Sequence, residues 1–297
     1  MISASEWVIT VLVLSGIIIF DLLVAIIRRN SETTVKESAL WTIFYVLAAI
    51  IFGLNLQFNG VAGHGEEFFA GWLTEYSLSV DNVFIFIILL ANLNVKRESA
   101  QLILLAGIAI ALVLRGIFIA LGSALISKFS AAFFIFAIIL IATAWKLIKE
   151  KHGDEKVYKE GRIITALRKR GASTFTIALV AVGTTDLIFA LDSIPAIFGL
   201  TKDPYIVFTA NAFALMGLRQ LYFLLAGLVD RLIYLSKGLA VILGFIGFKL
   251  FIEGLHGVGI DKIGFYEIPH ISLTVSLGVI GAALSVTTLI SLTATRK

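Results

Sequence analysis

The hydrophobic positions of this chain fall into long runs that are separated by short polar segments. A run of about 17–25 apolar residues is long enough to cross a hydrocarbon core of about 30 Å as an α-helix. Such a segment must be helical because lipid cannot satisfy backbone N–H and C=O groups. The pattern predicts nine spans, at residues 7–27, 39–54, 68–91, 100–121, 131–148, 174–200, 205–229, 238–252 and 271–292.

The composition agrees with an all-α polytopic membrane protein and excludes several other classes. Of the 297 residues, 59% are hydrophobic and 15% are charged, whereas about 25% are charged in a soluble domain. The chain has no cysteine, which excludes disulfides and thiolate metal sites. The first run has neither a basic segment before it nor a small-residue cleavage site after it, so we interpret it as a retained span rather than a signal peptide.

The positions of the basic residues predict the orientation in the membrane. With the N-terminus outside, eighteen of the 24 Lys and Arg residues lie in or beside inside segments, and only Lys128, Lys202 and Lys262 lie outside. Under the positive-inside rule this bias places the C-terminus inside, in a cell (inner or plasma) membrane. The basic charge therefore orients the chain and indicates no nucleic-acid partner. The polar connection 149–172 is either a solvated orienting loop or a contact with anionic lipid headgroups.

Two parts of the chain repeat the same polar positions in the same order. Glu75 and Asp81 in the third span correspond to Asp186 and Asp192 in the sixth, each 111 residues later. Further along, Arg115 corresponds to Arg219 at an offset of 104 residues, and Lys146 to Lys249 at an offset of 103. Because the third span enters from outside and the sixth from inside, the two three-helix units have opposite orientation. An inverted repeat of this kind is typical of transporters, whose sites lie near the midplane.

The repeat divides the chain into five parts. We predict two N-terminal helices (1–66), a first three-helix unit (67–150), a basic connection (151–172), an inverted second unit (173–255), and a ninth helix with the C-terminus (256–297).

Acidic residues inside the predicted spans point to a cation site. An ionised side chain at the membrane centre costs at least about 2.5–3.5 kcal/mol, so such residues are functional by default. Six residues separate the two carboxylates of each motif, which places them roughly 120° apart on a continuous helix. Either the two carboxylates have different roles, or the helix is broken near Asn82, Ser193 and Pro195 and its freed carbonyls become ligands.

We expect Asp81 and Asp192 to form the core of one shared site near the midplane, with Asn82, Ser193 and Asn211 as further oxygen ligands. Oxygen ligands suit magnesium, calcium or manganese. All four histidines fall in predicted loops, which makes zinc and copper poor candidates.

The other charged residues have open interpretations. Glu75 and Asp186 act either as a gate or proton acceptor, or as capping groups nearer the span entrances. Arg115 and Arg219 are interpreted as structural counter-charges. The alternative for Asp81 and Asp192 is that they simply pair with these two arginines.

The chain resembles the TerC family of integral membrane proteins along three segments, which begin at Glu75, Thr185 and Asn211 and end at Phe86, Phe198 and Phe223. Its N-terminal extension, with Lys36-Glu-Ser-Ala-Leu-Trp41, is similar to the Alx branch of that family. This resemblance implies export of manganese(II) as the transported ion, with no organic cofactor. It also implies that the acidic motif residues are Glu75, Asp81, Asn82, Asp186, Asp192 and Ser193.

Three functions follow as hypotheses. The preferred one is a manganese exporter that works by alternating access, surrounded by membrane lipids, with proton counter-transport through Glu75 or Asp186 as an option. The second is an intramembrane aspartyl hydrolase, although no Gly-x-Gly-Asp motif is present. The third is a metal-delivery or assembly partner that moves no ion itself.

Overall fold

The computed structural model describes residues 3–27, 34–149, 162–225, 234–263 and 266–294. Within those ranges, nine candidate spans are long and apolar enough to cross a membrane. The predicted number of spans and the all-α membrane class are confirmed. The described helices are α1 (Ala4–Ile27), α2 (Val35–Asn59), α3 (His64–Asn92), α4 (Arg97–Lys128), α5 (Ala132–Lys149), α6 (Arg162–Lys169), α7 (Thr174–Phe198), α8 (Pro204–Met216), α9 (Leu218–Leu225), α10 (Leu235–Gly257) and α11 (Leu273–Ala294).

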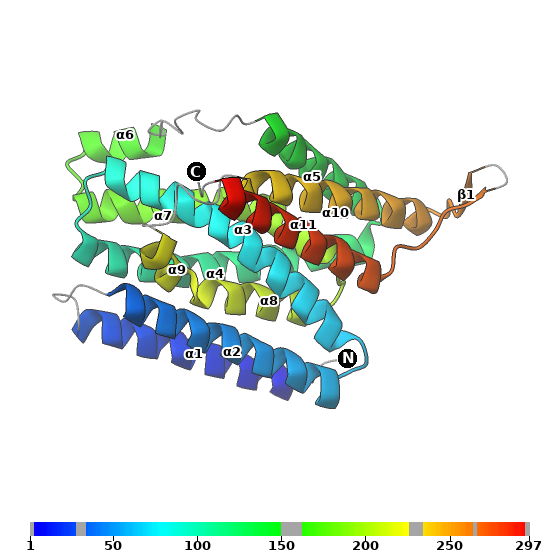
Figure 1. Cartoon of the computed structure of the whole chain (residues 1–297), viewed down its shortest axis with the longest axis horizontal. Helices are drawn as coiled ribbons and strands as arrows, with labels where there is room; N and C mark the ends of the chain where they lie inside the picture. The colour runs from blue at the N-terminus through cyan, green and yellow to red at the C-terminus, as the bar shows by residue number, and fades with distance from the viewer. Residues whose placement is uncertain (1–2, 28–33, 150–161, 226–233, 264–265, 295–297) are drawn as a thin grey trace.

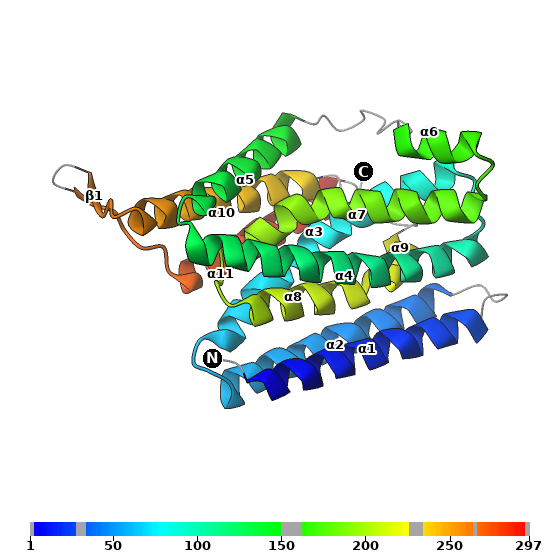
Figure 2. The same ribbon diagram turned by 180° about the vertical axis from the view of Figure 1, so that it is seen from behind.

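The long helices lie side by side in a bundle, and the N-terminal pair forms one edge of it (Figure 1). In this bundle α3 packs against α8, α4 against α7, and α5 against α10. The helix α2 packs against α3 and α9, and α11 packs against α10. Seen from behind, α4, α7 and α8 lie next to one another through the middle of the bundle (Figure 2). A short hairpin of β1 (Lys262–Ile263) and β2 (Tyr266–Glu267) projects from one end.

Apolar side chains fill the contacts between these helices. One buried cluster joins α3, α4, α7 and α9 and includes Phe86, Ile103 and Val182. On the other side, a second cluster joins α3, α5, α7 and α10. Large apolar side chains on α1, α2 and α5 remain exposed, as expected for surfaces that contact lipid.

Of the two options that the acidic motifs left open, a break in the third and sixth spans is ruled out. Helix α3 continues through Asn82, and α7 continues through Ser193 and Pro195. Proline removes one backbone donor, but neighbouring helices can hold a transmembrane helix in shape around it. Here every residue from Ser193 to Phe198 is buried, so packing around Pro195 keeps the helix continuous.

The break lies instead in the span that we predicted at 205–229. Helix α8 ends at Met216, and α9 begins at Leu218 after Gly217. The helix that corresponds to it in the predicted repeat, α4, is continuous. The connection predicted at 149–172 also contains a helix, α6, whose Ile164 is buried against the core; residues 150–161 lie outside the described part.

The prediction that all four histidines lie in loops is also wrong. His64 is the first residue of α3, and His256 lies in the last turn of α10. His152 is outside the described residues.

Candidate functional site

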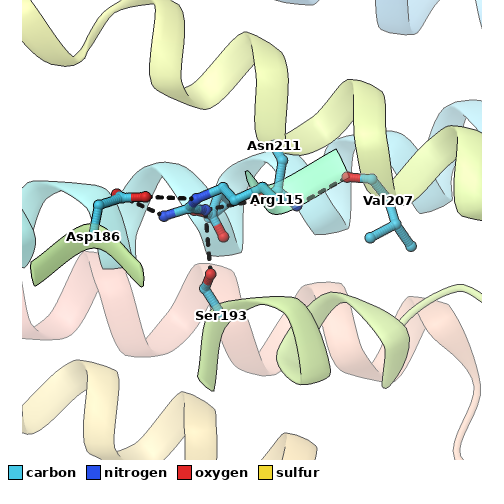
Figure 3. A network of polar contacts seen from close by, with 6 residues as sticks. Arg115, Asp186, Ser193, Val207 and Asn211 are labelled. Carbon is cyan, nitrogen blue, oxygen red and sulfur yellow. Dashed lines mark hydrogen bonds and ion pairs between the residues drawn. The ribbon is translucent and has the colours of Figure 1, made fainter. Parts of the chain in front are cut away.

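A buried arginine collects oxygen atoms from three other helices. Arg115 on α4 is fully buried. Its Nη2 and Nε atoms donate to the two carboxylate oxygens of Asp186 on α7, at 3.1 and 3.3 Å. Its Nη1 atom donates to Glu75 Oε1 on α3 and to Asn211 Oδ1 on α8, the latter at 2.6 Å. The same atom lies 3.2 Å from Ser193 Oγ. Figure 3 shows Asp186, Ser193 and Asn211 reaching the guanidinium from different sides. We call these five residues the Arg115 cluster.

Helix geometry explains this convergence. Asp186 and Ser193 are seven residues apart on α7, which returns them to nearly the same face after two turns. A side chain at position 107 would separate α4 from α7, because a Cβ atom on Gly107 would lie 2.8 Å from Val182 Cγ1. The glycine therefore permits the close approach that brings Arg115 to Asp186.

The Asn211 amide is oriented by its own helix. Its Nδ2 atom donates to the backbone carbonyl of Val207 at 2.9 Å (Figure 3). Because the nitrogen is used in this way, the amide oxygen faces Arg115. The sequence suggested Asn211 as an oxygen ligand, and the structure places that oxygen in the Arg115 cluster.

At Nη1 of Arg115, oxygen acceptors outnumber hydrogens. Nη1 carries two hydrogens and faces three acceptors, on Glu75, Ser193 and Asn211. The second carboxylate oxygen of Glu75, Oε2, is buried and has no hydrogen-bond partner among the described residues. With both carboxylates ionised, the two acids and one guanidinium carry a formal charge of −1. The cluster is thus rich in hard oxygen donors and negative charge.

A separate cavity of about 310 Å³ lies between α3, α5, α7 and α10. Its polar lining comes from Asn82, Thr143, Lys146 and Asp192. Asn82 is buried, and Asp192 is partly exposed. Asp192 lines the cavity, and its chain neighbour on α7, Ser193, contacts Arg115. The cavity therefore adjoins the Arg115 cluster.

The predicted site residues therefore divide between two neighbouring places. Glu75, Asp186, Ser193 and Asn211 meet at Arg115, and Asn82 and Asp192 meet at the cavity. The two carboxylates of the second motif lie apart because α7 is continuous, which is the first of the two options that the six-residue spacing left open. Asp81 lies on α3, but its side chain is outside the described part of the structure.

The second arginine has a different partner from the first. Arg219 on α9 forms a buried ion pair with Asp21 on α1. Neither arginine uses Asp192 as its ion-pair partner; the described pairs of Arg115 are Glu75 and Asp186. Among the described side chains, the ion-pair partners of the two arginines are Glu75, Asp186 and Asp21.

Sequence reasoning missed two lining residues and one partner. Thr143 and Lys146 line the cavity, although Lys146 served only as a repeat landmark. Its position beside the cavity could have been found from the helical face that α5 turns toward α7. The pairing of Arg219 with Asp21 joins positions 198 residues apart, which no local pattern indicates.

The described side chains hold no ready-made metal site. Among them, no group of three or more His, Asp or Glu residues is placed to hold a metal ion. The Arg115 cluster supplies two carboxylates, an amide oxygen and a hydroxyl. These are ligand types that suit a hard cation, but the guanidinium lies among them.

Comparison with known proteins shows relatives over most of the chain. An uncharacterized membrane protein of Mycobacterium tuberculosis (strain ATCC 25618 / H37Rv) is 40% identical over 304 aligned positions, covering 94% of this chain and 76% of the relative. Another, from Rickettsia felis, is 36% identical and covers 84% of this chain and 88% of the relative. An uncharacterized membrane protein of Myxococcus xanthus is 35% identical, with coverages of 86% and 84%. No solved structure matches the chain.

A family model described as "Integral membrane protein TerC family" matches residues 62–297. The match contains the Arg115 cluster and the neighbouring cavity, and it leaves α1 and α2 outside. The chain is therefore a member of the TerC family of integral membrane proteins, a family linked to ion transport.

Proposed function

We propose that this protein exports manganese(II) across the cell membrane by alternating access, and that the ion passes through the cavity at Asn82 and Asp192. The oxygen donors present there and at Arg115 suit a hard divalent cation. Manganese and the outward direction come from the resemblance to the Alx branch. The Lys and Arg bias supports the orientation, with the N-terminus outside and the basic connection in the cytoplasm.

One observation carries the proposal. Polar groups from five helices, α3, α4, α5, α7 and α8, lie at two adjoining places inside the spans: the Arg115 cluster and the cavity of Asn82 and Asp192. Placing ionisable groups at this depth is costly in a protein that only needs to fold. A cavity that holds an acidic side chain beside a buried oxygen-rich cluster provides an entry point and a deeper binding position for a cation.

Helix packing supports the inverted repeat on which alternating access depends. In the predicted repeat, α3 corresponds to α7, α4 to α8 and α9 together, and α5 to α10. A twofold rotation that exchanges the two units would therefore replace the α3–α8 contact with the α7–α4 contact. Both contacts are present and equally extensive. The α5–α10 contact exchanges with itself, and it is the most extensive of all. This is the packing expected of two units related by a pseudo-twofold axis between them.

The hydrolase hypothesis receives less support from the geometry. An aspartic protease needs two adjacent carboxylates that share one proton. Asp186 is instead bound through both oxygens to Arg115, and Asp192 faces the separate cavity. A metal-delivery role would need the same ligands but no passage through the protein, and a flux measurement separates the two.

The test is uptake of divalent cations into liposomes that contain the purified protein. Manganese entering the vesicles is followed by quenching of trapped calcein, with calcium and magnesium measured in parallel. We expect manganese flux above that of protein-free liposomes and lower flux of the other two ions. No flux of any cation would contradict transport and favour a delivery or assembly role.

A further inference from the structure

The four oxygen-bearing side chains around Arg115 form the kind of ligand set that a hard divalent cation uses. They come from α3, α7 and α8, and they comprise two carboxylates, one amide oxygen and one hydroxyl. The guanidinium has five hydrogens in all, but at Nη1 three acceptors face only two of them. The unpartnered Oε2 of Glu75 is buried at the same place. The surplus of oxygen indicates a second ligand besides the arginine.

The charges lead to the same conclusion. With both acids ionised, Glu75, Asp186 and Arg115 sum to −1, inside a part of the protein where all three side chains are almost fully buried. A divalent cation in place of the guanidinium brings the sum over the two acids and the ion to zero. If Arg115 stayed in place when the divalent cation bound, the charges of the two acids, the guanidinium and the ion would sum to +1 instead. Charge balance therefore favours exchange of the two cations over binding both together.

We propose that Arg115 is a tethered cation that occupies the deeper metal position, and that the transported ion binds there by displacing its guanidinium. This inference rests on the proposed transport function and adds a regulatory device to it. In the absence of metal, the guanidinium keeps the carboxylates compensated, so the empty carrier can change conformation without leaving two buried negative charges uncompensated. The metal then binds more weakly than its ligands alone would allow, which helps its release.

Asp192 gives the displaced guanidinium a place to go. It lines the cavity next to the cluster, and its chain neighbour Ser193 already contacts Arg115. A cation that moves from the cavity onto Glu75 and Asp186 leaves Asp192 uncompensated at the moment when Arg115 loses its own partners. The exchange thus moves two positive charges past each other between neighbouring acidic positions.

The test compares manganese affinity and manganese flux in Arg115→Gln. Affinity is measured by isothermal titration of the purified protein, and flux in proteoliposomes. If the guanidinium holds the site for about nine-tenths of the time, apparent affinity is reduced about tenfold, because only the competent fraction binds. We expect Arg115→Gln to bind manganese about tenfold more tightly and to lose most of its flux.

The second arginine provides the matched control. Arg219→Gln removes a buried guanidinium that faces Asp21, away from the oxygen-rich cluster, so its manganese affinity should stay at the wild-type value. Arg115→Lys retains the positive charge, and its affinity should stay closer to wild type than that of Arg115→Gln. A folded Arg115→Gln protein with equal or weaker affinity would overturn the inference.

A measurement on the wild-type protein covers the case in which Arg115→Gln does not fold. Anomalous scattering from crystals grown with saturating manganese should place the ion between Glu75 and Asp186, with the Arg115 side chain turned away. Manganese found elsewhere, with the guanidinium still bound to Asp186, would overturn the exchange. If the wild type moves no cation at all, the transport proposal itself fails. If it transports but shows no exchange, only the inference about Arg115 fails.

Discussion

Replacing Asp21 with Asn would leave the Arg219 guanidinium buried without the carboxylate that it contacts. Asp21 is 4% exposed and Arg219 is 8% exposed, so water cannot replace the lost charge. The pair joins α1 to α9, just after the break at Gly217. The substitution therefore tests whether this ion pair holds α1 against the part of the chain that the family model matches.

Two reference values bracket the expected loss. A neutral hydrogen bond between transmembrane helices contributes about 0.6 kcal/mol on average. Breaking a buried ion pair by removing one partner costs about 3–5 kcal/mol, because the other charge is left uncompensated. Since both side chains are more than nine-tenths buried, we expect Asp21→Asn to lower the free energy of unfolding by about 3 kcal/mol.

The free energy of unfolding can be measured by titration with sodium dodecyl sulfate in mixed micelles. The double variant Asp21→Asn with Arg219→Gln should regain a large part of the loss, because no unpaired charge remains. Glu66→Gln is the matched control, since Glu66 lies exposed in the first turn of α3. A loss below about 1 kcal/mol in Asp21→Asn, or a double variant less stable than both single variants, would refute this reasoning.

Two further predictions concern the site. Gly107→Leu should lower the free energy of unfolding by about 1–3 kcal/mol and reduce manganese flux, because its side chain would push Val182 and separate α4 from α7. Gly183→Ala is the control, since a Cβ there meets nothing within 4 Å, and it should leave stability and flux nearly unchanged. Equal losses of stability in the two variants, measured by unfolding titration, would contradict this packing role of Gly107. Lys146→Gln should raise manganese affinity, because it removes a positive charge from the cavity that Asp192 lines. Unchanged or weaker affinity, measured by calorimetry, would show that Lys146 does not oppose cation binding.

Much of the fold follows from the sequence because lipid imposes a simple rule on it. Every span must satisfy its own backbone, so length and hydropathy identify the helices. The same rule explains why the predicted breaks failed. Asn82 and Pro195 favour a break locally, but helix–helix packing decides whether one forms, and the packing around Pro195 is dense. The break at Gly217 has no comparable local signal, since glycine is common inside transmembrane helices.

The site residues were easier to identify than their grouping. Ionisable and amide side chains inside spans stand out, and six of the seven predicted ligand residues lie in the Arg115 cluster or the cavity. Which acid meets which arginine depends on contacts between distant helices. Arg115 and Arg219 are equivalent in the predicted repeat, yet the first faces Asp186 and the second faces Asp21 from the N-terminal extension. A repeat in the sequence cannot reveal this asymmetry.

The most direct test of the proposed pathway is manganese flux into proteoliposomes that contain Asp192→Ala or Asn82→Ala, measured beside wild type and Glu267→Gln. Glu267 is an exposed acid on the projecting hairpin that pairs with Lys262, so its substitution should leave flux unchanged. We predict that Asp192→Ala abolishes flux and that Asn82→Ala reduces it, with all three variants folded. Wild-type flux in Asp192→Ala would contradict a pathway through this cavity.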